Sequence, residues 1–449
     1  MTMTADTATA DAVGCSAALR ELAVVHLSAC DDYGGSARAA YRLHGGLRQR
    51  GWSSRMLVAR KVTNDLDVGS IWPHAGWRTA DAACRVVSDR FGLPDLYSPS
   101  SGRLRRHPWI QAAHIIQCYN THGGFLPYAA IVALSRQRPV VWRLDDMWAL
   151  TGHCAYSYEC ERWVTGCGAC PHLGEPPALR LDTTRLLWRR KARTFQGARL
   201  TLVAPSTWMA GLIRRSPLLG HCEVHHIPYG VDLALFRPLS RAEARGRLGW
   251  PTGGSVVLYV AQSVQERRKG GDLLRAALER IRPTKGAPPW RLVIIGGDAR
   301  GWPPRVGAVE VTTVGYLGDA NHMALAYAAA DLTILPSRAD NLPNVLIESA
   351  ACGTPAVTFD VGGCGEVVRH LETGYVAVPE SVEDLGRGLQ RLLEDGALRL
   401  ELGRRARTVA EAEYGLDLEV DRYVRLYQEV AAGRTRQAAT SVHDGRPQG

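Results

Sequence analysis

Short apolar runs alternate along the chain with longer segments in which apolar residues recur every three to four positions. The first apolar run covers 22–27, a polar turn follows at 31–35, a helical pattern covers 36–50, and a second apolar run covers 54–59. Short apolar runs predict buried strands, and the longer periodic segment predicts a helix. This order of strand, turn, helix and strand predicts the start of a parallel α/β sheet.

The same alternation continues to the C-terminal region. It predicts further strands at 114–118, 140–144, 200–204, 256–260, 291–295, 332–335 and 356–359. It predicts helices at 127–136, 185–196, 271–280, 322–330 and 344–351. Two tandem α/β domains fit this pattern better than one large sheet, with the joint at 226–238, which holds two prolines and a glycine.

We therefore expect five segments. They are a disordered N-terminus (1–19), an N-terminal α/β domain (20–238) with a Cys-rich insertion (150–172), a C-terminal α/β domain (239–415), an amphipathic helix (416–432) and a disordered tail (433–449).

The composition of the chain narrows the classes of protein to which it can belong. The chain has 449 residues, of which 46% are hydrophobic and 22% charged, and this balance excludes an intrinsically disordered protein. The sequence contains no run of eighteen apolar residues, so a transmembrane helix is not expected. Residues 1–14 lack the basic and apolar regions of a secretory signal. We expect a cytoplasmic protein.

The net charge is +10, and nearly all positive charge comes from arginine. No nucleic-acid recognition motif accompanies the charge, so a nucleic-acid partner is not expected. The eleven cysteines are odd in number and unevenly spread, which favours thiols or a metal site over a disulfide framework.

Two glycines, Gly34 and Gly35, lie between the first predicted strand and the first predicted helix. Glycine lets the backbone approach a ligand closely, and the helix N-terminus behind it offers unpaired N–H groups to a phosphate. The alternative is an ordinary strand-to-helix turn. The third glycine of the dinucleotide fingerprint is missing.

Two acids eight positions apart follow the predicted strand at 332–335. Asp340 falls in the loop after the strand, and Glu348 falls on the next predicted helix. Carboxylates at the carboxyl end of a parallel strand can accept hydrogen bonds from sugar hydroxyls in one cleft. The N–H groups of Asn341 and Leu342 would bind the same ligand. The alternative is that both acids are solvated at the surface.

The segment 336–357 (PSRADNLPNVLIESAACGTPAV), followed by Gly362-Gly363, Glu366 and Gly374-Tyr375, resembles the donor-site signature of the GT-B glycosyltransferases of family 4. The resemblance implies an α/β GT-B fold of two Rossmann-like parallel-sheet domains that face an interdomain cleft. It further implies that the C-terminal domain binds a nucleotide sugar and the N-terminal domain an acceptor. The last helix would cross back onto the N-terminal domain.

The resemblance assigns donor-site residues. It implies donor contacts by Asn341, Leu342, Pro343 and Glu348. Family members usually have a glutamate where this chain has Asp340. The family retains anomeric configuration and generally needs no divalent metal, so we expect no cofactor for catalysis.

A basic turn, Arg267-Arg268-Lys269-Gly270, follows the predicted strand at 256–260. In the resembled family an arginine and a lysine here hold the donor diphosphate, and Lys269-Gly270 matches that pattern. Two cations would stabilise the charge that develops on a departing diphosphate. We assign these roles to Arg268 and Lys269; the alternative is a solvated basic turn.

Four cysteines, Cys154, Cys160, Cys167 and Cys170, have the spacing C-x5-C-x6-C-x2-C. Four thiolates at short spacing can form a closed tetrahedral site for structural zinc. The alternative is a cluster of inert buried thiols, and His153 beside the first cysteine could serve either.

The segment 142–171, which contains these cysteines, resembles a subgroup of family 4 in bacterial polysaccharide assembly. Subgroup members usually read Thr-Leu-His-Asp-Met where this chain reads Arg-Leu-Asp-Asp-Met, so Asp145 replaces a histidine and Asp146 remains. The segment 120–124 (NTHGG) also resembles the subgroup, which implies that His122 contacts donor or acceptor. The predicted catalytic residues are Asp340, Glu348, Arg268, Lys269, His122 and Asp146.

The resulting prediction is a retaining, hexosyltransferase-type glycosyltransferase. It would move a sugar from a nucleotide sugar to a saccharide, lipid-linked or small-molecule acceptor, in polysaccharide or lipid-linked oligosaccharide assembly. The basic stretch 185–199 with Trp188 is either a peripheral membrane surface or a solvated helix face. Alternatives are glycosylation of a natural product, a GT-B nucleotide-sugar epimerase and a non-catalytic sugar-nucleotide-binding subunit.

Overall fold

The computed structural model describes residues 22–443 except 73, 96 and 283–288, with side chains described as far as residue 433. The predicted disordered N-terminus and residues 444–449 lie outside the described residues. The chain divides into two compact units. Unit 1 comprises the chain up to Pro205, Ala210–Ile227 and the chain from Glu419 onward; unit 2 comprises Ser206–Met209 and Pro228–Leu418.

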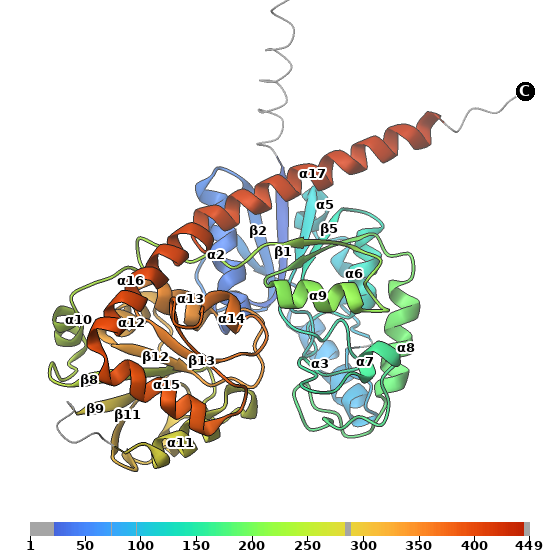
Figure 1. The fold of residues 1–449 in the computed structure, drawn as a ribbon. Helices are drawn as coiled ribbons and strands as arrows, with labels where there is room; N and C mark the ends of the chain where they lie inside the picture. Colours follow the sequence, from blue (N-terminus) through green and yellow to red (C-terminus); the bar gives the residue numbers. More distant parts are fainter. Residues whose placement is uncertain (1–21, 73, 96, 283–288, 444–449) are drawn as a thin grey trace, which may run out of the picture. The chain divides into compact units, whose positions relative to one another are not determined.

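Unit 1 is built on a parallel sheet with the strand order β3-β2-β1-β4-β5-β6-β7 (Figure 1). Its strands are β1 (Ala23–Cys30), β2 (Ser53–Arg60), β3 (Val68–Ser70), β4 (Ile115–Cys118), β5 (Val140–Arg143), β6 (Leu200–Ala204) and β7 (Glu223–His226). Its helices are α2 (Gly35–Gln49), α3 (Ala75–Arg90), α4 (Ser101–Leu104), α5 (Pro108–Ala112), α6 (Tyr128–Ser135), α7 (Arg162–Thr165) and α8 (Thr184–Phe195), with most of α9 (Thr207–Arg215).

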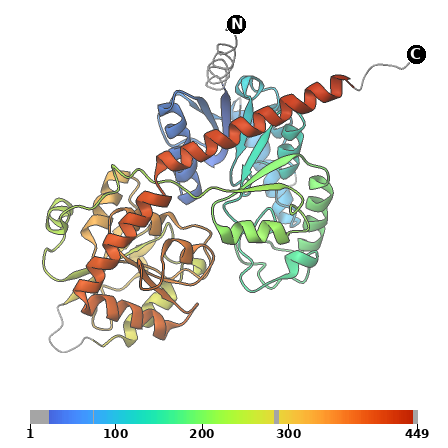
Figure 2. The same ribbon diagram turned by 45° about the horizontal axis from the view of Figure 1, so that its top comes forward.

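The long C-terminal helix α17 (Leu416–His443) belongs to unit 1 from Glu419 onward and lies along that unit in Figures 1 and 2. Tyr427 Oη donates to Gln117 Oε1 of β4 at 2.9 Å. Arg50 pairs with Asp421 at 2.8 Å. The helix extends to His443, past residue 432 where the sequence pattern placed its end, so the prediction of a disordered tail from 433 is wrong up to that residue.

Unit 2 repeats the architecture with the strand order β10-β11-β9-β8-β12-β13-β14, parallel except for the β10–β11 pair. Its strands are β8 (Ser255–Val260), β9 (Trp290–Ile295), β10 (Arg305–Val306), β11 (Val309–Gly315), β12 (Leu332–Leu335), β13 (Ala356–Phe359) and β14 (Gly374–Ala377). Its helices are α10 (Arg241–Leu248), η1 (Arg267–Lys269), α11 (Gly271–Arg280), η2 (Ala299–Gly301), α12 (Ala320–Ala329), α13 (Asn344–Ala351), α14 (Cys364–Val367), α15 (Val382–Glu394) and α16 (Gly396–Glu413).

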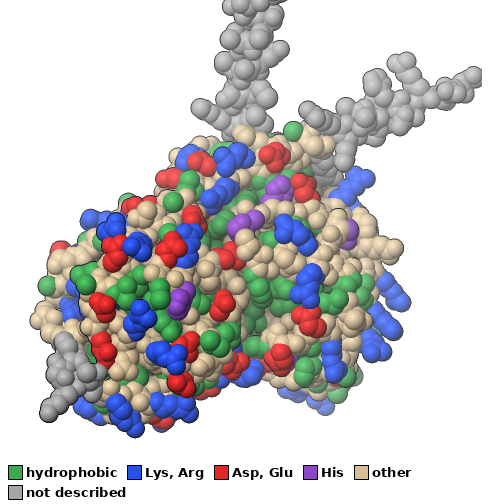
Figure 3. Space-filling model, in the orientation of Figure 1, with side chains coloured by type: hydrophobic (Ala, Val, Ile, Leu, Met, Phe, Trp, Pro, Cys, Tyr) green, Lys and Arg blue, Asp and Glu red, His purple; other side chains and the backbone are tan. Residues whose placement is uncertain are grey.

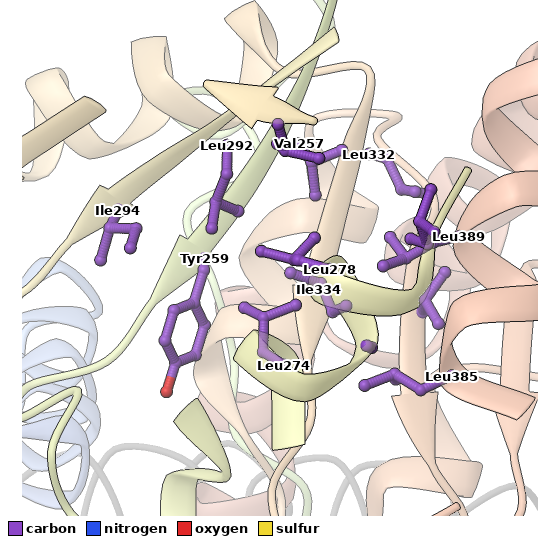
Figure 4. Packing of buried hydrophobic residues seen from close by; sticks show 14 of the residues in the cluster. Val257, Tyr259, Leu274, Leu278, Leu292, Ile294, Leu332, Ile334, Leu385 and Leu389 are labelled. Atoms are coloured by element: carbon purple, nitrogen blue, oxygen red, sulfur yellow. The ribbon is translucent and has the colours of Figure 1, made fainter. Parts of the chain in front are cut away.

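The core of unit 2 lies between the sheet and helices α11 and α15 (Figure 4). Leucines of α11 and α15 at helical spacing meet alternate residues of β8, β9 and β12, and the side chains of Leu274, Leu278, Ile334 and Leu389 are fully buried. The apolar runs of the central strands arise because a parallel sheet is covered on both faces.

The observed elements confirm the predicted α/β class with two Rossmann-like parallel sheets. Every predicted strand and helix is present, with small differences in bounds. The pattern missed the short strands β3, β7, β10 and β14 and the helices α3, α15 and α16, among other elements. Within the described part of the chain, no helix combines the length and the apolar character needed to cross a bilayer.

Candidate functional site

The candidate donor site of unit 2 lies where the strand order reverses. β8 sits between β9 and β12, and the loops after β8 and β12 leave the same edge of the sheet. In open parallel sheets this reversal point is where ligands bind. The predicted cations follow β8, and the predicted acids follow β12, so one edge carries both.

The two predicted cations meet the loop acid in one ion-paired group. Lys269 Nζ lies 2.6 Å from Asp340 Oδ2, and Arg268 Nη1 lies 3.4 Å from the same oxygen. Both cations belong to the short turn η1, which ends at Gly270 in a left-handed conformation with φ +67°. A Cβ at Gly270 would lie 1.8 Å from the Pro336 carbonyl oxygen, so only glycine lets the turn approach the Asp340 loop this closely.

Asp340 is a buried, ionised acid. Burial acts to raise its pKa, but the charges of Lys269 and Arg268, with hydrogen bonds from Lys269 and Ser337, hold the pKa below its ordinary value. Its side chain is 10% exposed. The alternative of a solvated surface acid is therefore wrong for Asp340.

The remaining predicted donor residues are also buried. Glu348 on α13 is 6% exposed, which excludes a solvated acid there too, and Asn341 and Leu342 are 2% and 3% exposed. The Asn341 side chain accepts a hydrogen bond from Ser206 Oγ at 2.5 Å. Pro343 is the N-terminal capping residue of α13.

Sequence reasoning missed the residues that hold this group in place. Glu266 binds Arg268 Nε at 2.7 Å, so Arg268 bridges Glu266 and Asp340. Arg338 binds both oxygens of Asp272 at 2.7 and 2.6 Å and donates to the Arg267 carbonyl at 2.8 Å. These contacts tie η1 to the β12 loop. The only sequence signal was the density of charge in both segments.

The predicted phosphate loop of unit 1 lies at the corresponding reversal point, between β1 and β4. Gly34 has φ +87° and immediately precedes α2, which begins at Gly35. The preceding Asp31 is fully buried and accepts hydrogen bonds from the backbone N–H groups of Val62 and Thr63, each at 2.8 Å. Asp31 therefore has a structural role, and the ligand-binding role of Gly34 and Gly35 stays a prediction.

His122 and Asp146 form an acid–base pair at the ends of β4 and β5. His122 Nε2 lies 2.8 Å from Asp146 Oδ2, and Asp146 Oδ1 accepts the Trp148 N–H at 2.9 Å. Burial acts to lower the pKa of His122, but the charge and hydrogen bond of Asp146 raise it above its ordinary value. The His122 side chain is 24% exposed, so it remains accessible to a ligand.

Asp145 is engaged in an ion pair inside unit 1. Arg143 Nε lies 2.6 Å from Asp145 Oδ1, and Ser36 Oγ donates a short hydrogen bond to Asp145 Oδ2. Arg143 is fully buried, its guanidinium lies 4.4 Å from the centre of the Tyr119 ring, and its Nη1 is 3.7 Å from Glu419 of α17. The two departures from the subgroup motif, at 143 and 145, thus form one pair.

The structure gathers the four predicted metal ligands around one small pocket. Cys154, Cys160, Cys167 and Cys170 line it together with His153 and His172. Burial raises the pKa of Cys154 to about 12 and that of Cys167 to about 11. Across the described residues, no three His, Cys, Asp or Glu side chains already stand in the arrangement of a metal site.

The comparisons with known proteins cover the part of the chain that holds this candidate site. Residues 240–409 match the family model described as Glycosyl transferases group 1. A D-inositol 3-phosphate glycosyltransferase from Acidothermus cellulolyticus is 37% identical over 231 residues, which is 48% of this chain and 49% of that protein. The chain thus matches about half the length of this relative.

Solved structures resemble a larger part of the chain. Sucrose-phosphate synthase from Thermosynechococcus elongatus has a TM-score of 0.63 at 21% identity and covers 92% of this chain and 100% of its own. Anabaena Alr3699/HepE in complex with UDP and glucose has a TM-score of 0.62 at 17% identity, with 90% and 99% covered. These likenesses confirm the GT-B fold class. Residues 240–409 of this chain are thus similar to the Glycosyl transferases group 1 family.

Proposed function

We propose that the protein is a retaining glycosyltransferase that moves a hexose from a nucleotide sugar to an acceptor hydroxyl. The observation that carries the proposal is the Arg268–Lys269–Asp340 group at the reversal point of a group 1 domain. Paired cations at a strand-to-helix turn suit a diphosphate, and buried carboxylates suit sugar hydroxyls. Unit 2 would bind the donor and unit 1 the acceptor.

The proposed chemistry needs no metal or cofactor to balance. The bond between the anomeric carbon and the diphosphate oxygen breaks, the acceptor oxygen bonds to the same face of that carbon, and the acceptor proton passes to the departing phosphate. Arg268 and Lys269 would stabilise the developing negative charge. Glu348 would orient the sugar through its hydroxyls, and the His122–Asp146 pair would contact donor or acceptor.

The structural neighbour Alr3699/HepE has been solved with UDP and glucose, which supports UDP-glucose as the first donor to test. The half-length relatives named D-inositol 3-phosphate glycosyltransferase make D-inositol 3-phosphate one acceptor to test. We propose a saccharide or lipid-linked oligosaccharide as the physiological acceptor. This rests on the resemblance of segment 142–171 to enzymes of polysaccharide assembly.

A lipid-linked acceptor is supported by a basic, apolar surface on unit 1. Phe91 at the end of α3 is 61% exposed, and Leu181 and Leu186 near the start of α8 are 52% and 49% exposed. Thr183 Oγ1 donates to the Gly92 carbonyl, so these segments adjoin. Figure 3 shows Lys and Arg side chains along the margin of unit 1 where Figure 1 draws α8.

We propose that this surface contacts an anionic membrane face peripherally. Trp188, which sequence reasoning placed on that surface, instead donates to the Trp163 carbonyl at 2.9 Å. Co-sedimentation with vesicles of anionic and of neutral lipid tests the contact. The membrane contact is supported if the protein binds anionic vesicles and Leu186→Ser binds them less. It is contradicted if the protein binds neutral and anionic vesicles equally well.

The transfer proposal is tested with Glu348→Gln, which keeps the size of the side chain and removes the charge. The matched control is Glu279→Gln, an exposed acid on α11 of the same unit. We expect UDP release from UDP-glucose to require acceptor and to fall strongly in Glu348→Gln but not in the control. Full transfer by Glu348→Gln contradicts the proposal. Conversion of donor without acceptor indicates an epimerase instead, and donor binding without turnover indicates a non-catalytic subunit.

A further inference from the structure

Four cysteines from a stretch with little regular structure surround one atom-sized space in unit 1. Cys154, Cys160, Cys167 and Cys170 all line the same pocket. The pocket has a volume of about 10 Å³, which is room for about one water-sized sphere. The ten cysteines of the described residues are all free thiols. The space is therefore sized for a single small occupant among sulfur atoms.

The backbone around Cys167 is held in an unusual conformation. Residues 166–169 all have positive φ values, 111°, 55°, 97° and 47°, although Cys167 and Ala169 are not glycines. A non-glycine residue in this region is disfavoured because its Cβ lies too close to the following carbonyl oxygen. Such strain persists only where the surroundings impose it, and it concentrates at functional sites.

Several contacts impose that conformation and direct the loop toward the pocket. The Gly168 N–H donates to Thr184 Oγ1 at 3.0 Å, and the Cys170 N–H donates to Asp182 at 2.8 Å. Arg162 donates to the carbonyl of Gly168 at 3.1 Å. The Gly152 N–H donates to the Cys167 sulfur at 3.2 Å, a contact that strengthens when the sulfur is a thiolate.

We propose that this pocket is a structural Zn²⁺ site with Cys154, Cys160, Cys167 and Cys170 as the four ligands. Zn²⁺ prefers four thiolates in a closed tetrahedron when its role is structural. Binding releases the four thiol protons to solvent and forms four Zn–S bonds, so no oxidant or reductant takes part.

The ligand set closes through side-chain rotation. The described residues contain no group of three or more His, Cys, Asp or Glu side chains placed to hold a metal ion, so the four thiols would have to rotate to bind one. Cysteine has one rotatable side-chain bond with three staggered positions, so the sulfur can move while the backbone stays fixed. His153 is not counted among the ligands, because four thiolates already complete a tetrahedral site; its Nδ1–H donates to the Pro177 carbonyl at 2.9 Å, and its Nε2 lies 3.4 Å from the Cys170 sulfur.

The metal would staple a loop that also carries part of the candidate site. Cys154 follows the segment of Trp148 and Thr151, whose carbonyls both accept from the buried Lys191 Nζ, at 2.5 and 3.0 Å. Zinc bound by Cys154 would therefore hold the C-terminal end of the segment 148–154, whose other end is held by Lys191. The inference does not depend on the proposed transferase activity.

The experiment measures zinc in the full chain, purified with reducing agent and without chelator. Plasma mass spectrometry should find about one zinc per chain in the wild type and in Cys222→Ser, a partly buried cysteine outside the pocket. Each of Cys154→Ser, Cys160→Ser, Cys167→Ser and Cys170→Ser should lose at least ~90% of it. Less than a tenth of an equivalent in the wild type, or full zinc in Cys170→Ser, overturns the proposal.

A second measurement avoids variants that fail to fold. A mercurial reagent added to the folded wild type should release the zinc in step with the modification of four thiols. Cobalt substituted for zinc should show the strong thiolate-to-metal absorption of a tetrahedral sulfur site. Zinc that stays bound after all accessible thiols are modified, or disulfides among the four cysteines, overturns the proposal.

Discussion

Gly362 offers a sharp test of how the candidate donor site is positioned. It has φ +56°, and a Cβ built there lies 1.7 Å from the Asp340 carbonyl oxygen. Real Cβ contacts essentially never fall below 3.0 Å, so in Gly362→Ala the Asp340 loop must move by at least ~1.3 Å, the difference between 3.0 and 1.7 Å. The matched control is Gly249→Ala, which has φ +67° and open space around the added methyl group.

Both variants pay the left-handed backbone cost of about 1–2 kcal/mol. Gly362→Ala should lose about 1–3 kcal/mol more from the forced displacement. A displacement of about 1 Å near reacting groups can lower a rate by about 100-fold, so we expect a loss of that order in transfer from UDP-glucose. Urea unfolding and a UDP-release assay measure the two effects. Equal stability and equal activity of the two variants would refute the reasoning.

Three further predictions follow from the packing and the charges. Arg143→Thr should destabilise unit 1 by about 3–5 kcal/mol, because it leaves the buried Asp145 without its cation. The double variant Arg143→Thr/Asp145→His should recover part of that loss in urea unfolding. Additive effects of the two single substitutions would contradict the pairing. Because the pKa of His122 is raised in the folded protein, its pair with Asp146 stabilises the fold fully below about pH 6.5, and this stabilisation is lost as the pH rises through the raised pKa. The difference in Tm between wild type and Asp146→Asn should therefore be widest near pH 5.5 and narrow by pH 9. A difference in Tm that does not depend on pH would contradict this prediction. Leu278→Ala in the core of Figure 4 should cost about 2–5 kcal/mol without changing the zinc content, and a loss below 1 kcal/mol by urea unfolding would show that this core is loosely packed.

The fold class was predictable because buried parallel strands carry continuous apolar runs. β1, β8 and β12 stand out in the sequence for this reason. Short edge strands such as β3 and β10 have too few residues to show a pattern. Helix α3 was missed because only Asp81 among its residues is buried, so it has no apolar stripe.

The candidate site was predictable where charge and glycine follow a strand. Arg268, Lys269 and Asp340 were identified from that position together with the resemblance to the family 4 signature, and they form one ion-paired group. The partnership of Arg143 with Asp145 was not foreseen, because a two-residue separation in a strand end gives no sign that the side chains meet. The support from Glu266 and Arg338 likewise depends on contacts between segments far apart in the chain.

The central claim is that the cations of η1 hold the diphosphate of a nucleotide sugar, and calorimetric titration of UDP into the full chain tests it most directly. Arg268→Ala is the informative variant, because Lys269 still neutralises Asp340, and Arg267→Ala is the control from the same turn. A charged hydrogen bond contributes about 1.5–3 kcal/mol, so affinity should fall about 10- to 100-fold in Arg268→Ala and stay unchanged in Arg267→Ala. Equal affinity in wild type and Arg268→Ala, or no binding of UDP by the wild type, would contradict the account.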